Sequence, residues 1–367
     1  MRLPGKPHLV ALSVVVGTSV AGLAQSASPS PTPTPPPAPP PIKLLLTSLI
    51  PDATLEMAGD LRFISASDGV WVSNRATGKV AKIDTKTNKP GAALDAGKEP
   101  CFGIVSAFRS LWVPLCGSKT LARIEPPAEP VPASPAGSGA PAGSGAPAEP
   151  AKPAAPAKPD EKPKGPVSIS TGLRGVGPLV SATGSIWMIT DEKGSLVRID
   201  PDTNAVVAEV TVPDGASALA VSGDALWLVS KAKSMVSRVN GYTNVVEETV
   251  KVGTSPLAVA SGEGSVWVLN GDGTVSRIDP KANKVTETIK TGATGATGAI
   301  VVGEGSVWIS TPGFPLSRVD PKTNRLAQQF TGPGGGVLLI AQKSIWLTAT
   351  PTHVWRVDPR RVEATRK

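Results

Sequence analysis

The polar residues best placed to bind a ligand or an ion lie in short turns, each of which follows an apolar run containing tryptophan. The turns differ from one run to the next, and a binding site is expected at the positions where a repeated sequence varies. The candidates are Asn74, Arg75, Asp191, Glu192, Lys231, Lys233, Asn270, Asp272, Phe314 and His353. The carboxylates of Asp191, Glu192 and Asp272 are of the ligand type that Ca²⁺ or Mg²⁺ prefers. The same residue types also serve ordinary turns, so no cofactor is firmly implied.

Histidine is scarce in this sequence. Of its two histidines, His8 lies in an apolar N-terminal segment and His353 lies near the C-terminus. A metal cluster built on several His side chains is therefore excluded, and a Ser-His-Asp triad would depend on His353 alone. The alternative for His353 is a structural or solvated role. The sequence thus leans away from an enzyme without excluding one, because a raised-pKa carboxylate or a metal-bound water can replace His.

Cys101 and Cys116 are the two cysteines of the chain, and they flank a turn centred near residues 108–110. A hairpin centred there places the two side chains opposite each other. Because an exported chain with two facing cysteines is expected to oxidise them, the sequence predicts a disulfide. The alternative is a free, buried pair of thiols.

Seven tryptophans at comparable positions define the elements that carry the candidate turns. They are Trp71, Trp112, Trp187, Trp227, Trp267, Trp308 and Trp346. A period of about forty residues is the signature of a propeller or a solenoid. Each period contains short runs rich in Val, Ile and Thr that are separated by Gly, Asn-Gly or Asp-Pro, and four such strands form a propeller blade. We therefore predict an all-β, seven-bladed β-propeller with four antiparallel strands per blade.

The copy with Trp267 shows the expected strands most clearly. From the channel outward, strand A covers residues 256–260, B 265–269, C 274–279 and D 284–290. Strand B is apolar on both faces, as a sheet enclosed between two other sheets requires. In a propeller, the turns between strands B and C lie on the same face as the connections from D to the next A, around the mouth of the channel. This arrangement would gather the candidate residues at one face.

A basic residue recurs on strand C, about ten residues after each tryptophan. These residues are Lys82, Arg123, Arg198, Arg238, Arg277, Arg318 and Arg356. A ring of cations could bind an anion, but a feature present in every copy is better explained by the scaffold. We expect the cations to stack on a Trp face of their own or a neighbouring blade. The Asp-Pro that often follows suits a type I turn.

The remaining segments have compositions that argue against a packed core. Residues 1–24 resemble a secretory signal peptide, and residues 25–51 form a Pro-rich spacer. The propeller is then expected over residues 52–367, interrupted in blade two by a Pro-, Ala- and Gly-rich insertion at residues 126–166. We expect both the spacer and the insertion to be disordered, and the mature protein to be periplasmic or extracellular without a membrane span.

The net charge of +8 is spread over the repeats and the insertion instead of clustering with aromatic residues. Nucleic-acid binding is therefore not indicated. We expect a monomer whose partner is a small ligand or an envelope protein.

Residues 53–57 precede the first strand A, yet they resemble a strand D. We expect them to complete the last blade as its outer strand, which closes the ring without an open edge. The competing candidate for that strand is residues 362–365, which follow Asp358-Pro359.

The repeats at residues 264–285 and 305–326 make the chain similar to bacterial secreted propellers of the YVTN and streptogramin-lyase-like superfamily, over about residues 52–359. Streptogramin B lyases use a metal site with His and Glu near the channel. Here Glu263 and Glu304 lie in turns between strands A and B, and no His accompanies them, so those residues do not carry over. Gluconolactonase-type propellers hold a divalent metal with carboxylates and Asn, which Asn74, Asn270 and Asp191 match only loosely.

Two hypotheses of different classes follow from these features. In the first, the protein is an exported module that binds a ligand or an envelope protein through the face at the channel mouth. In the alternative, it is a metal-assisted lyase or lactonase with a carboxylate-based site.

Overall fold

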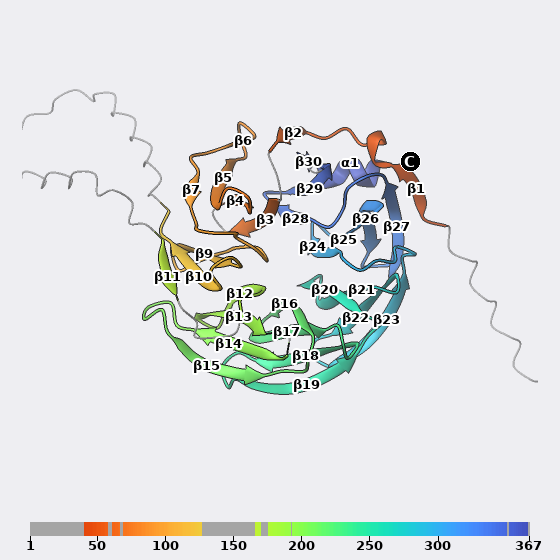
Figure 1. Cartoon of the computed structure of the whole chain (residues 1–367). Coiled ribbons are helices and arrows are strands. Elements are labelled where there is room, and N and C mark those ends of the chain that lie inside the picture. Colours follow the sequence, from red (N-terminus) through yellow and green to blue (C-terminus); the bar gives the residue numbers. More distant parts are fainter. Residues whose placement is uncertain are drawn as a thin grey trace, which may run out of the picture. The chain divides into compact units, whose positions relative to one another are not determined.

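Seven antiparallel sheets form a ring in the computed structural model of the chain, which confirms the predicted seven-bladed β-propeller (Figure 1). The structure describes residues 40–57, 61–66, 69–126, 166–169, 175–191, 193–350 and 352–365. The predicted signal peptide and nearly all of the predicted insertion at residues 126–166 lie outside these ranges.

The first three blades occupy the N-terminal half of the ring. Blade one contains β3 (Leu61–Ala66), β4 (Gly69–Asn74), β5 (Lys79–Asp84), β6 (Lys89–Pro90) and β7 (Leu94–Asp95). Blade two contains β8 (Val105–Ala107), β9 (Ser110–Leu115), β10 (Thr120–Ile124) and β11 (Val167–Ile169). Blade three contains β12 (Leu179–Ala182), β13 (Ser185–Asp191), β14 (Ser195–Ile199) and β15 (Val206–Thr211).

The last four blades follow in chain order. Blade four contains β16 (Ala216–Ser222), β17 (Ala225–Ser230), β18 (Met235–Asn240) and β19 (Val245–Lys251). Blade five contains β20 (Pro256–Gly262), β21 (Ser265–Asn270), β22 (Thr274–Asp279) and β23 (Lys284–Lys290). Blade six contains β24 (Ala299–Gly303), β25 (Ser306–Thr311), β26 (Phe314–Asp320), β27 (Arg325–Thr331) and the N-terminal β1 (Ile42–Leu45). Blade seven contains β28 (Leu338–Ala341), β29 (Ser344–Thr350), β30 (His353–Val357) and β2 (Ala53–Glu56).

Blade five agrees with the strands predicted from the sequence to within two residues at each end. Its second strand, β21, is buried at every position, because its two faces pack against different neighbours. Val266 and Val268 face blade four, whereas Trp267 and Leu269 face blade six. The run of apolar residues therefore reflects burial on both faces.

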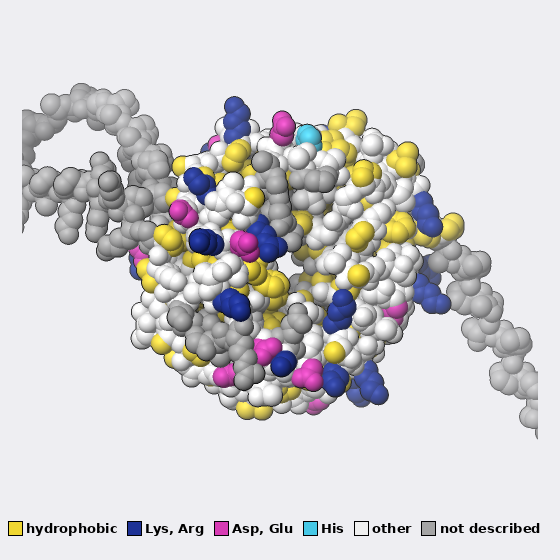
Figure 2. Space-filling view, in the orientation of Figure 1, with side chains coloured by type: hydrophobic (Ala, Val, Ile, Leu, Met, Phe, Trp, Pro, Cys, Tyr) yellow, Lys and Arg dark blue, Asp and Glu magenta, His cyan; other side chains and the backbone are white. Residues whose placement is uncertain are grey.

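The core consists of seven apolar clusters, and each cluster lies between two adjacent blades. The repeated tryptophan of each blade faces the following blade. Trp187 of blade three, for example, packs with Leu226 and Leu228 of blade four. Because each blade buries its two faces only against its neighbours, stability depends on closing the ring. Figure 2 shows the hollow at the centre of the ring.

The ring closes through the N-terminal strand, as predicted. β2 pairs with β30 in antiparallel register, with Ala53 opposite Arg356 and Glu56 opposite His353. The competing candidate at residues 362–365 is not a strand, because residues 359–364 form the helix α1 (Pro359–Ala364). Asp358 caps this helix by accepting a hydrogen bond from the backbone N–H of Arg360.

β1 departs from the predicted spacer, which was expected to extend through residue 51. β1 pairs in parallel with β27 and adds a fifth strand to blade six. The 3₁₀-helix η1 (Leu46–Ser48) follows, and Leu46 and Leu49 are buried in the cluster between blades six and seven. Residues 42–49 therefore belong to the propeller. Burial of the Leu46 and Leu49 side chains lowers the free energy of the folded chain, and an extended, solvated spacer would leave them exposed.

The predicted disulfide between Cys101 and Cys116 is present, with Cα atoms 6.0 Å apart. The backbone supports it, because Cys101 N–H donates to Pro114 O at 2.9 Å and Cys116 N–H donates to Glu99 O at 3.0 Å. Among the residues that the structure describes, no helix is long and apolar enough to cross a membrane.

Candidate functional site

The turns between strands B and C lie beside the connections from strand D to the next strand A. Lys231 N–H donates to Gly215 O at 2.9 Å, and Gly271 N–H donates to Ser255 O at 3.0 Å. In both cases the donor belongs to a B–C turn and the acceptor to a D–A connection. We call this side of the ring the mouth face. Most of the candidate residues lie on it.

In blade one, Asn74 and Arg75 begin the B–C turn after β4. The side-chain Oδ1 of Asn74 accepts a hydrogen bond from Thr77 N–H at 3.1 Å. Arg75 extends across the face to Glu99, where Nη2 lies 3.4 Å from Oε2 and both side chains are about half exposed. An exposed pair of this kind contributes roughly 0 to 1 kcal/mol to stability. The pair joins the B–C turn of blade one to the connection that leads into blade two.

In blade three, Asp191 ends β13 and accepts a hydrogen bond from Lys193 N–H at 2.8 Å. This contact is an Asx turn, which is the structural alternative foreseen for this carboxylate. The neighbouring candidate, Glu192, lies outside the described residues. Lys193 itself is exposed.

In blade four, Lys231 and Lys233 are both exposed in the B–C turn. The ammonium group of Lys231 donates to Ala296 O at 3.3 Å, although the two residues are 65 positions apart. Ala296 belongs to the connection between blades five and six. Lys231 therefore joins two regions of the mouth face.

In blade five, Asn270 and Asp272 differ in accessibility. Asn270 is fully buried, and its Nδ2 donates to Thr274 Oγ1 and to Ser276 Oγ, both at 3.0 Å. Its side chain is therefore not presented to solvent, in contrast to the exposed position expected for a binding residue. Asp272 is exposed, and it accepts from Thr254 N–H at 2.8 Å and from Thr274 N–H at 3.0 Å. Both residues shape their turn.

The last two candidates, Phe314 and His353, are half-buried at the first residues of β26 and β30. His353 Nδ1 lies 2.9 Å from Thr350 Oγ1 and 3.0 Å from Thr352 Oγ1, so neighbouring hydroxyl groups occupy this nitrogen. Within the described ranges, no group of three or more His, Cys, Asp or Glu side chains is placed to hold a metal ion.

The opposite face carries a repeated contact between blades. Each strand-C arginine is the cross-strand partner of the Trp on strand B, as with Arg277 and Trp267. In four blades the guanidinium lies over the indole ring, at 4.8 to 5.7 Å from the ring centroid. These pairs are Arg123–Trp112, Arg198–Trp187, Arg277–Trp267 and Arg356–Trp346. Stacking on the Trp of the same blade is thus one of the two alternatives that the sequence left open.

The same four arginines also bind the following blade. Arg277 Nε donates to Ser265 Oγ at 2.8 Å, and its Nη1 donates to Asn324 Oδ1 at 2.7 Å and to Pro321 O at 2.8 Å. Ser265 begins strand B of blade five, whereas Pro321 and Asn324 lie in the C–D turn of blade six. We call this set of a serine, an arginine and the next blade's asparagine a blade clamp. The other three are Ser110–Arg123–Asn204, Ser185–Arg198–Asn244 and Ser344–Arg356–Asn88.

In most blades an aspartate at the start of the C–D turn braces the loop that holds the asparagine, and in blade four Asn240 takes that place by accepting from Tyr242 N–H at 2.9 Å. Asp279 accepts from Lys281 N–H at 2.8 Å and from Ala282 N–H at 3.2 Å. These backbone donors, Lys281 first, lower the pKa of Asp279 because they stabilise the carboxylate. Asp84 and Asp200 show the same direction of pKa shift, mainly through the backbone N–H of Lys86 and of Thr203, respectively.

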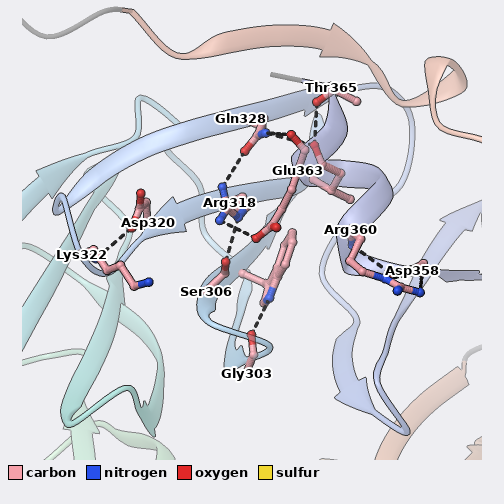
Figure 3. Close-up of polar contacts among 12 residues, drawn as sticks. Gly303, Ser306, Arg318, Asp320, Lys322, Gln328, Asp358, Arg360, Glu363 and Thr365 are labelled. Atoms are coloured by element: carbon pink, nitrogen blue, oxygen red, sulfur yellow. Dashed lines mark hydrogen bonds and ion pairs between the residues drawn. The ribbon is translucent and has the colours of Figure 1, made fainter. Parts of the chain in front are cut away.

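Blade six uses a carboxylate in place of the asparagine. Arg318 Nε donates to Ser306 Oγ at 2.8 Å, as in a blade clamp, but its Nη2 lies 2.7 Å from Glu363 Oε1 (Figure 3). Blade seven has no C–D turn, because its outer strand comes from the N-terminus. Helix α1 follows β30 instead and supplies Glu363.

Blade four lacks a complete clamp although its arginine is present. Ala225 stands where the other clamps have serine, so Arg238 Nε has no hydrogen-bond partner. Arg238 instead pairs with Glu247 of its own blade. Asn283 Oδ1 in blade five is then left without a partner as well.

The clamp was missed by sequence reasoning, although its three parts were visible. The Ser that begins strand B, the Arg opposite Trp and the Asn four residues after Asp occur together in several repeats. Their repetition predicts a scaffold, but only the fold shows that the Asn of one blade serves the Arg of the preceding blade.

No protein-family model matches the chain, and no curated protein matches it. Among solved structures, the chain is similar to hydrazine synthase of Kuenenia stuttgartiensis, with a TM-score of 0.44 and 17% sequence identity. The similarity covers 49% of this chain and 57% of the synthase chain, so it spans little more than half of that protein. The fold assignment therefore rests on the seven sheets themselves.

Proposed function

We propose that this protein is an exported, non-enzymatic binding module that engages an envelope protein or ligand through the mouth face. The single observation that carries the proposal is the different use of the two faces. On the face opposite the mouth, arginine, serine and asparagine side chains are engaged in blade clamps. Both faces present exposed lysines, but the turns of the mouth face differ between blades, whereas the C–D turns of the opposite face repeat one pattern.

The basic residues of the mouth face suggest the chemistry of the partner. Exposed cations occur in the turns or connections of blades one to four, at Arg75, Lys98, Lys119, Lys193, Lys231 and Lys233. The B–C turns of blades five and six contain no Lys or Arg. The exposed carboxylates of Glu99 and Asp214 lie on the same turns, so the cations are in excess there. A partner with exposed carboxylates would complement this excess, and charge complementarity of this kind fixes orientation and speeds association.

The disulfide supports the exported part of the proposal. Such bonds persist in oxidising compartments such as the periplasm or the extracellular space. The apolar segment at residues 1–24 provides an independent argument from sequence for export.

Photo-crosslinking tests which face binds. A photo-reactive amino acid is placed singly at Arg75, Lys193 or Lys233, and at the exposed residues Lys86, Lys281 or Lys322 of the opposite face as matched controls. In the native envelope, we expect the three mouth-face positions to yield one common adduct that the controls do not form. Adducts formed mainly from the control positions would overturn the proposal.

A further inference from the structure

A cavity of about 330 Å³ opens beside the outer part of blade one. Its apolar lining comes from Met57, Val72, Val80, Ala81, Pro90 and Ala93. Its polar lining comes from Glu56, Asn74, Thr77 and Lys79. Glu56 and Met57 belong to the end of β2 and the residue after it, so the cavity lies where the first and last blades meet.

The cavity results from an interruption in the outer strand of blade one. In blade five, β23 pairs with β22 from Asp279–Lys284 to Thr274–Lys290. Blade one has pairs at the matching ends, Asp84–Lys89 and Lys79–Asp95, but its outer strand is divided into β6 and β7. Residues 89–95 of blade one form a stretch as long as β23. The two outer strands therefore differ in the path that the chain takes between its paired ends.

The residues between β6 and β7 explain why the cavity is not filled. Gly91, Ala92 and Ala93 occupy the positions at which β23 has Thr286, Glu287 and Thr288. The preceding Pro90 has no N–H to contribute to the sheet. The small side chains leave the space beside Ala81 open. Gly within a strand often marks a bulge or a place where a ligand or another backbone approaches closely, and Pro is confined to edge strands, strand starts and bulges.

The lining limits the kind of molecule that fits. Water occupies about 30 Å³ per molecule in the liquid, so the cavity holds about ten non-hydrogen atoms. Val72 and Val80 are buried and supply an apolar floor. Lys79 and Glu56 carry opposite charges, so the net charge of the cavity lining is zero. The lining therefore favours neither a cationic nor an anionic ligand.

We propose that this cavity binds a small, mostly apolar molecule with one uncharged polar end, such as an alcohol or an ester. The polar end would lie near Asn74 and Lys79, which are cross-strand partners on β4 and β5. Asn74 and Thr77 also belong to the B–C turn of the mouth face, but the rest of the lining comes from the sheet of blade one, the segment between β6 and β7 and the end of β2, so the test below is independent of partner binding.

Ala92 and Ala93 provide a matched pair for the test. Both are exposed alanines on the same segment, but only Ala93 lines the cavity. The probes are 1-hexanol, hexanoate and hexylammonium, which share an apolar body and differ in charge. Binding to the full chain is measured by the NMR shifts of the Gly91 and Ala93 amides.

We expect 1-hexanol to shift the amide signals of Gly91 and Ala93 saturably and to bind with a lower Kd than either charged probe. Ala93→Trp should weaken its binding about tenfold or more, whereas Ala92→Trp should change it less than about twofold. If Ala93→Trp perturbs folding, Ala93→Met provides a smaller side chain that still enters the cavity. No saturable shift with 1-hexanol, tighter binding of a charged probe, or equal effects of the two Trp variants would overturn the proposal.

Discussion

Arg356 Nη1 donates a hydrogen bond to Asn88 Oδ1 at 3.0 Å, and the two residues are 268 positions apart. This blade clamp joins the last blade to the first. The ring is closed in two ways. The pairing of β2 with β30 completes the sheet of the last blade, and the clamp from Arg356 to Asn88 crosses the boundary between the last blade and the first. A buried apolar cluster that includes Val70, Val72 and Trp346 fills the same boundary, so the clamp acts there together with side-chain packing.

Arg356→Lys should destabilise the protein by about 1.5 to 3 kcal/mol, the usual range for hydrogen bonds to a charged group. Lysine keeps the charge, but it lacks the fork of donors that reaches Ser344 and Asn88 together. Urea unfolding measures the change. Lys86→Ala, in the same turn as Asn88, is the control and should stay within about 0.5 kcal/mol. Equal stability of Arg356→Lys and the native chain would show that the clamp contributes nothing.

Ala225→Ser should stabilise the protein by about 0.5 to 1.5 kcal/mol, because it supplies the hydroxyl that Arg238 Nε lacks. In blade five the corresponding contact, from Arg277 Nε to Ser265 Oγ, measures 2.8 Å. Asn283 Oδ1 would then gain Arg238 as a donor. The effect is checked by thermal unfolding beside Ser265→Ala, which should shift stability in the opposite direction. A destabilised Ala225→Ser variant would count against the clamp as a transferable unit.

Replacing Cys101 and Cys116 by serine should lower stability by about 3 kcal/mol, as expected for a bond that closes a loop of 15 residues. The chain-entropy model attributes this loss to a less restricted unfolded state. Unfolding of the native protein with and without reductant provides the second measurement. The prediction fails if neither reduction nor the double substitution changes the transition midpoint.

Stability should fall in acid through the turn aspartates. The folded-state pKa of Asp84, Asp200 and Asp279 lies below the usual 3.8, so their contribution is present above that pH. It is lost as the pH falls through the lowered pKa values. In the triple Asp→Asn variant, the amide oxygens still accept the turn hydrogen bonds but do not titrate. We therefore expect a smaller loss of stability between pH 4 and pH 2 for this variant than for the native chain. An unchanged pH dependence would contradict this assignment.

The sequence predicted most of the fold because each blade repeats the same local rules. The pattern of Trp267 and its neighbours defined the strands of blade five, and the resemblance of residues 53–57 to a strand D led to the correct closure of the ring. β1 could not be found in this way. Its pairing depends on the edge of β27, which lies almost 300 residues away and exists only after folding.

The candidate site was harder to predict than the fold. Variation among the B–C turns identified Arg75, Lys231 and Lys233, which the structure exposes on one face. The same criterion also selected Asn270, which is buried. Sequence variation cannot separate a side chain that shapes a turn from one that faces a partner, because both change freely between repeats.

The most direct test of the mouth-face proposal is the affinity of the purified partner, identified by crosslinking, for two charge-reversed variants. The first carries Arg75→Glu, Lys231→Glu and Lys233→Glu, and the control carries Lys86→Glu, Lys281→Glu and Lys322→Glu. Both variants lower the net charge by the same amount. A difference between their affinities therefore reflects which face was changed and not the overall electrostatic field of the protein. By calorimetry, we expect the first variant to raise Kd at least about tenfold and the control to change it less than about twofold. Equal losses, or a larger loss for the control, would contradict binding through the mouth face.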